Sequence, residues 1–205
     1  MAQRAIKLFL IKIVPVFVVS MVAWQKLGIS NIYHSLMASV LNLFAVFDRP
    51  GLDGGLITEP GKFGMRCFYS GTMTDIPLET FALQITGNAP LLIALYLSSP
   101  VMAVKRTYLV YFLIALLGLF LTHAVTSILL IQLGVMTTPG WSDIARFYDY
   151  GSGYITFLKY YKSFYEVFGL YVFVLVLWLP YVGTYVVRTN RGRAFAKQEA
   201  KKITQ

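Results

Sequence analysis

Charged residues are scarce in this chain. Only 13% of its 205 residues are Asp, Glu, Lys or Arg, whereas 57% are hydrophobic. A soluble domain of this length needs a larger share of charged side chains to cover its surface. The composition therefore excludes an ordinary soluble domain and predicts a membrane protein.

Cysteine and histidine are almost absent. Cys67 is the single cysteine, so an intrachain disulfide is excluded. His34 and His123 are the only histidines, and no Cys–His cluster has the spacing of a zinc site. We therefore expect no metal and no cofactor. The alternative is a pigment or haem, which needs a single axial ligand from His123 or His34.

Long apolar blocks are what the sequence does contain. A hydrocarbon core of roughly 30 Å needs about 20 mostly apolar helical residues to cross it. Four blocks qualify, at residues 5–24, 81–104, 108–135 and 164–187. The sequence thus predicts an all-α integral membrane protein with four transmembrane helices, forming a single polytopic domain over residues 1–205.

Basic residues are distributed unevenly between the connecting segments. The N-terminal stretch, the turn at Lys105–Arg106 and the tail 188–205 together hold eleven Lys or Arg and one acid, Glu199. Segments 25–80 and 136–163, with the adjoining span ends, hold seven basic and eight acidic residues. This positive-inside bias predicts that both termini and the Lys105–Arg106 turn are cytoplasmic. We expect the protein in the cytoplasmic (inner) membrane of a prokaryote. The charge bias assigns the basic tail to anionic lipid and not to nucleic acid.

The predicted outer segments carry three features. Apolar residues at helical spacing from Ile32 to Phe44 predict an extracytoplasmic amphipathic helix over residues 30–44, with Ser30 as its N-cap. Residues 56–58 and 63–68 flank the turn at 59–62 and predict a short β-hairpin that brings Cys67 to the outer membrane surface. The later segment, 137–162, is rich in Tyr and Phe, which is typical of an interfacial aromatic belt, with a ligand site as the alternative.

The layout resembles the exosortase and archaeosortase family of membrane cysteine transpeptidases. The shared features are an amphipathic segment, a turn-rich hairpin, a cysteine before a span, a short basic turn and a returning span with a polar residue near its outer end. Cys67 is followed by Ser70–Gly71 where the family has Cys-Ser-Gly, and Gly169-Leu170-Tyr171-Val172-Phe173 is similar to the family's Gly-Leu-x-x-Phe. The resemblance implies a helical membrane scaffold and, in an active member, a nucleophilic cysteine.

Two reactive positions of that family are replaced in this chain. Where the family has Asn-x-x-Arg, this chain has Thr122-His123-Ala124-Val125-Thr126, and the family histidine before the last span is missing. A thiol needs a neighbouring base or cation to become an effective nucleophile, and His123 is the only candidate near the outer leaflet. We therefore expect a non-catalytic accessory or scaffold subunit that contacts lipids and other membrane proteins. The alternative is a divergent thiol transpeptidase or protease that uses Cys67 with His123.

Overall fold

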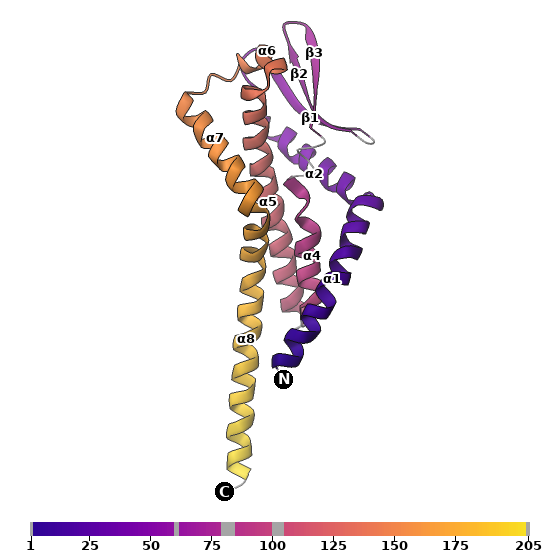
Figure 1. The fold of residues 1–205 in the computed structure, drawn as a ribbon, viewed down its shortest axis with the longest axis vertical. Helices are drawn as coiled ribbons and strands as arrows, with labels where there is room; N and C mark the ends of the chain where they lie inside the picture. Colours follow the sequence, from indigo (N-terminus) through magenta and orange to yellow (C-terminus); the bar gives the residue numbers. More distant parts are fainter. Residues whose placement is uncertain (1, 60–61, 79–84, 100–104, 204–205) are drawn as a thin grey trace.

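The computed structural model describes residues 2–59, 62–78, 85–99 and 105–203. A bundle of long helices carries a small sheet at one end, and both chain termini lie at the other end (Figure 1). The helices along the long axis are α1 (Ala2–Lys26), α4 (Ala89–Ser98), α5 (Lys105–Thr137) and α8 (Leu170–Ile203). The mainly helical fold class is thereby confirmed.

Three helices in the described parts are long and apolar enough to cross a membrane. They cover residues 7–26, 106–137 and 152–187. The predicted span 81–104 differs from these, because its described part is interrupted. A helical turn at Ile85–Thr86 is followed by a turn at Gly87–Asn88, and the ten-residue α4 begins at Ala89. Residues 81–84 and 100–104 of that predicted span lie outside the described residues.

The long helices expose apolar side chains in stripes. On α5, Val110, Leu113, Leu117, Leu121 and Val125 recur every three or four residues and are each 45–59% exposed. Stripes of the same kind lie on α1 and α8. Apolar surface of this extent on a single chain belongs against lipid or another apolar partner, which agrees with a multi-pass membrane protein.

The predicted amphipathic helix is present as α2 (Ile29–Leu43). It runs obliquely across the end of the bundle, between the end of α1 and the sheet (Figure 1). The prediction of Ser30 as N-cap is wrong. Gly28 caps the helix in the left-handed region, at φ 72°, and Ser30 is buried inside the first turn. Glycine adopts this φ without a steric penalty, so it forms the sharp corner after α1.

The predicted hairpin is the first half of a three-stranded antiparallel sheet. Its strands are β1 (Asp53–Glu59), β2 (Lys62–Tyr69) and β3 (Thr72–Pro77), in the order β1-β2-β3. Ser70 and Gly71 join β2 to β3 with φ values of 49° and 76°, the two positive values of a type I′ hairpin turn. The Ser-Gly pair that resembled a family motif therefore forms the turn that adds β3, a strand absent from our prediction.

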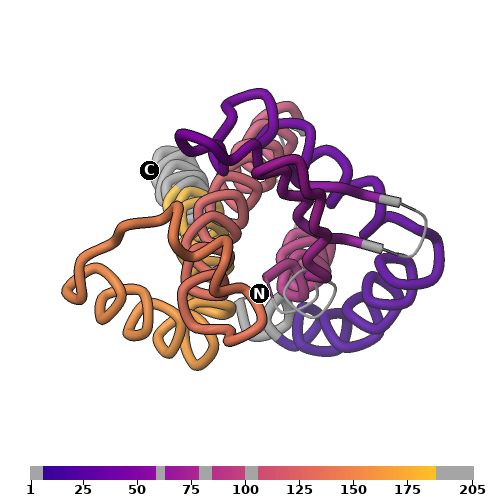
Figure 2. The backbone as a smooth tube through the Cα atoms, turned by 90° about the horizontal axis from the view of Figure 1, so that it is seen from above, coloured from indigo at the N-terminus to yellow at the C-terminus, as the bar shows by residue number. Residues whose placement is uncertain are grey.

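The segment after α5 folds back as helix. A short turn η1 (Pro139–Trp141) and α6 (Ser142–Ala145) lead to α7 (Ser152–Phe164), which passes through the π-turn η2 (Tyr165–Gly169) into α8. Seen along the bundle, α7 lies to one side of α5 and the strands lie to the other (Figure 2). Aromatic residues of α7 attach it to α5, because Tyr154 donates to Gln132 and Tyr161 bonds to Thr126, both at 2.7 Å.

Candidate functional site

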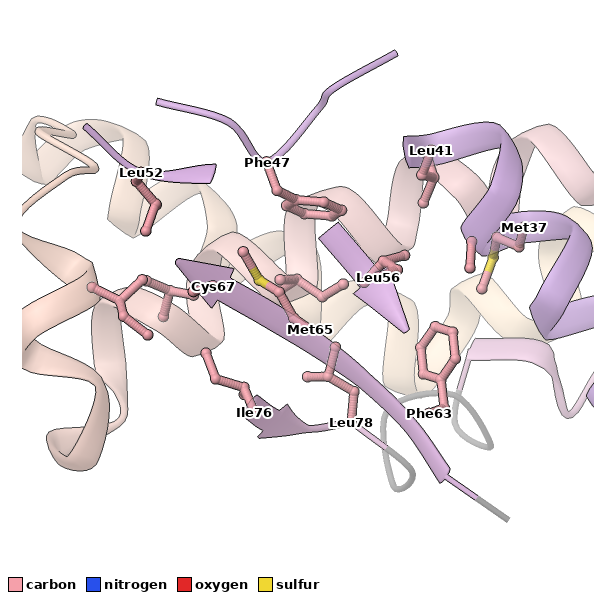
Figure 3. Packing of buried hydrophobic residues seen from close by; sticks show 14 of the residues in the cluster. Met37, Leu41, Phe47, Leu52, Leu56, Phe63, Met65, Cys67, Ile76 and Leu78 are labelled. Atoms are coloured by element: carbon pink, nitrogen blue, oxygen red, sulfur yellow. The ribbon is translucent and has the colours of Figure 1, made fainter. Parts of the chain in front are cut away.

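Cys67 lies in the middle strand of the sheet, with its side chain in the core. It pairs with Gly54 of β1 and Thr74 of β3 and is fully buried. Its cluster includes Met65, Ile76 and Tyr148, and Figure 3 labels Cys67 among apolar side chains of this cluster. Burial, assisted by the Asp75 carboxylate, raises the pKa of the Cys67 thiol to about 11. At neutral pH this environment favours an unreactive thiol over a thiolate.

The cations near Cys67 in sequence do not activate it. Arg66 points to the opposite face of the sheet, as strand alternation predicts. There its guanidinium makes two hydrogen bonds of 2.7 Å to the Asp75 carboxylate, which lies directly across on β3. Lys62 begins β2 five residues away from Cys67. The arrangement around the thiol is that of a core residue.

His123 occupies a second buried site, inside the helix bundle. Its Nε2 lies 2.7 Å from Asn88 Oδ1, and its Nδ1 lies 2.7 Å from the Tyr33 hydroxyl. Asn88 Nδ2 donates to the carbonyl of Leu170 at 2.9 Å. The Asn88 oxygen therefore faces the imidazole and can only accept, so His123 Nε2 carries the proton. In the neutral ring, Nδ1 then accepts the proton of the Tyr33 hydroxyl.

This chain of hydrogen bonds engages both ring nitrogens of His123. A general base for Cys67 needs a free lone pair, and the Nδ1 lone pair of His123 is taken by Tyr33. Hydrogen bonds join His123 to Tyr33 on α2 and to Asn88 in the turn before α4, whereas Cys67 belongs to the cluster under the sheet. Among the described residues, no hydrogen bond connects the two predicted site residues.

The polar chain lies where two helices are interrupted. The turn at Gly87–Asn88 interrupts the helix before α4, and η2 interrupts the passage from α7 to α8. A side chain at each interruption donates a hydrogen bond to a backbone carbonyl at the other. Asn88 donates to Leu170 O, and the Tyr165 hydroxyl donates to Ile85 O at 2.8 Å. Interruptions inside a bundle are tolerated when neighbouring side chains satisfy the freed backbone groups.

Both histidines have side-chain partners. His34 Nε2 lies 3.0 Å from Thr86 Oγ1, and its ring packs against Phe63 at 5.3 Å. His123 has both nitrogens engaged. The alternative of a pigment or haem ligated by His123 or His34 stays a prediction. Among the described residues, no three His, Cys, Asp or Glu side chains gather as a metal site would require.

Asn88 and Tyr33 are the residues of this site that sequence reasoning missed. Asn88 had a signal, because Gly87-Asn88-Ala89-Pro90 combines a turn residue, an N-cap residue type and a proline in the first turn of a helix. Tyr33 had no comparable signal, since its role depends on a partner 90 positions away. Comparisons with protein-family models, with curated proteins and with solved structures found no match.

Proposed function

We propose that the chain is a four-span protein of a prokaryotic cytoplasmic membrane, with both termini in the cytoplasm. Residues 81–104, of which the structure describes 85–99, would form the second span. Two observations support this arrangement. The start of α1 and the end of α8 both lie toward the end of the bundle away from the sheet (Figure 1), and the segments assigned to that side hold eleven basic residues against one acid. The sheet and Cys67 would then lie outside the cytoplasm.

Within that membrane, we propose a non-catalytic accessory or scaffold subunit built on an exosortase-like arrangement of helices. The observation that carries this proposal is that Cys67 and His123, the two candidate reactive residues, are buried in different places. Cys67 is fully buried among apolar side chains, and His123 is held between Tyr33 and Asn88. A catalytic cysteine needs an accessible thiol with a base in reach.

The outward face of the sheet is the surface offered to a partner. Phe68 and Met73 face each other across β2 and β3 and are 50% and 63% exposed, beside the Arg66–Asp75 ion pair. The strands behind them are fixed by the packed core around Cys67 and Met65. A rigid hairpin with an apolar pair and a flanking ion pair suits contact with the outer part of another membrane protein.

Photo-crosslinking in native membranes tests the proposal. A benzophenone amino acid at Met73 should give a discrete adduct with another membrane protein. The same probe at Val18, an exposed residue on α1, serves as the matched control and should give no such adduct. Cys67→Ala and His123→Gln should leave the adduct intact, because neither side chain reaches the outward face.

The enzyme alternative predicts different results for the same variants. A thiol transpeptidase or protease would lose a processing activity in Cys67→Ala and in His123→Gln to the same extent, since residues that act as a unit are non-additive. It would also run on native gels near its own 23.1 kDa plus detergent. These two results, together with no adduct at Met73, would contradict the accessory-subunit proposal and support the enzyme alternative.

A further inference from the structure

Helix α2 is divided along its length into three faces. Successive residues of an α-helix are turned by about 100°, so residues three, four or seven apart share a face. The first face is buried and packs on the protein: it consists of Ser30, His34, Met37, Ala38 and Leu41. The other two faces are exposed, and they differ in chemistry.

One exposed face is apolar and the other is polar. The apolar face consists of Ile29, Ile32, Leu36 and Leu43, which are 40%, 71%, 55% and 80% exposed. The polar face consists of Asn31, Ser35, Ser39 and Asn42, all exposed. The two remaining residues, Tyr33 and Val40, are half-buried and lie between the apolar face and the core. A helix that met only water, or only lipid, would not separate its exposed residues in this way.

Exposed apolar residues lie on both sides of the corner between α1 and α2. Val18 and Val22 are each 54% exposed near the end of α1, and Leu27 at the Gly28 corner is 73% exposed. On α2, Ile32 and Leu36 are exposed as well. No charged residue occurs from position 27 to position 47. Lys26 lies in the last turn of α1, and beyond it the exposed apolar side chains of α2 meet no charge in the sequence until Asp48, which suits an apolar medium.

We infer that α2 lies in the outer leaflet of the bilayer at its boundary with water, with its apolar face among the acyl chains and its polar face toward the headgroups. Its oblique course across the end of the bundle suits a helix in the plane of the interface (Figure 1). The inference rests on the proposed membrane topology and commits to lipid as the occupant of this face. It places the membrane boundary along α2, with His123 on the membrane side and the sheet on the water side.

Spin labels on α2 test this placement by measuring which positions contact lipid and which contact water. Single cysteines are introduced into a Cys67→Ala background and the labelled protein is reconstituted into phosphatidylcholine–phosphatidylglycerol vesicles. Collision with oxygen reports acyl chains, and collision with a water-soluble nickel chelate reports water. The measured quantity is the ratio of the collision rate with oxygen to that with the nickel chelate. This ratio should be at least fivefold higher for labels at Ile32 and Leu36 than for labels at Ser35 and Ser39 on the same helix. Labels at Val18 and Thr72 are the lipid and water controls.

The controls separate the two proposals. If Val18 reports lipid while Leu36 reports water, the placement of α2 is wrong and the membrane topology stands. If Val18 itself reports water, the membrane proposal fails. If Ile32 and Leu36 collide with neither reagent, a protein covers this face, and the assignment to lipid is overturned.

Discussion

The side-chain amide of Asn42 pairs with both backbone groups of Leu56. Asn42 Nδ2 donates to Leu56 O at 2.8 Å, and Leu56 N donates to Asn42 Oδ1 at 2.7 Å. Leu56 lies on β1, whose other edge faces β2. One side chain of α2 thus takes the place of a neighbouring strand and fixes the sheet to the helix bundle. An unpaired strand edge is otherwise a template for association with other chains.

Replacing Asn42 should loosen the sheet. Asn42→Leu removes both hydrogen bonds and should lower the free energy of unfolding by about 1–3 kcal/mol. Asn42→Asp keeps an acceptor for the Leu56 N–H and loses the donor, so its effect should also be destabilising. Amide hydrogen exchange at Leu56 and thermal unfolding in detergent measure both changes. Asn31→Leu, on the exposed polar face of the same helix, is the control, and an equal loss in that variant would contradict the bracing role of Asn42.

The thiol of Cys67 should resist modification in the folded protein. Its pKa of about 11 leaves on the order of one thiolate in a few thousand at pH 7.5, and the side chain is fully buried. A small maleimide should therefore label Cys67 only after denaturation. A cysteine placed at Met73 in a Cys67→Ala background should react within minutes. Rapid native labelling of Cys67 at neutral pH would indicate an accessible, activated thiol.

The raised pKa of Cys67 also predicts how the free energy of unfolding changes with pH. A raised pKa means that the folded state holds the thiol proton more tightly than the unfolded state does. The corresponding stability is fully present below the ordinary thiol pKa and is lost as pH rises toward about 11. Wild type should therefore lose more stability than Cys67→Ala between pH 8.5 and 10.5, as measured by thermal unfolding. Parallel loss in the two proteins would show that Cys67 does not contribute.

The sequence predicted the elements whose signals are local. Apolar blocks located α1 and α5 within a few residues, and the turn at 59–62 located β1 and β2. The third strand was missed because Ser70–Gly71 was compared with a family motif and not considered as a hairpin turn. The N-cap of α2 was misassigned because Ser30 is a common capping type, while Gly28 depends on the left-handed corner after α1.

The site was less predictable because its bonds are long-range. His123 was identified as a polar residue in a span, but its partners come from α2 and from the turn before α4. The interruption at Gly87–Asn88 was hidden within an apolar block long enough to cross a bilayer. Hydropathy reports the average of a window and does not detect one asparagine that joins two interrupted helices.

The ion pair on the outward face of the sheet should contribute little to stability. The guanidinium of Arg66 and the carboxylate of Asp75 are directly opposite and bidentate, but their side chains are 39% and 47% exposed. Exposed pairs of this kind typically couple by about 0.2–1 kcal/mol. A double-mutant cycle with Arg66→Ala and Asp75→Ala measures the coupling, which should fall as salt is added. A coupling above about 2 kcal/mol would show that the pair is structural rather than part of an exposed surface.

Asn88 should be the most sensitive residue of the polar chain. Asn88→Ala would leave the His123 Nε2–H and the Leu170 carbonyl without their partner, and each unsatisfied buried group costs about 1–3 kcal/mol. The expected loss is about 2–4 kcal/mol, together with weaker attachment of α8 at η2. Asn31→Ala removes an exposed amide from α2 and should change stability by less than about 0.5 kcal/mol. Unfolding in detergent gives the energies, and nitrogen NMR of His123 should show a proton on Nε2 in the wild type. An Asn88→Ala protein as stable as Asn31→Ala, or a wild-type His123 protonated on Nδ1 alone, would contradict the proposed chain from Tyr33 to Leu170.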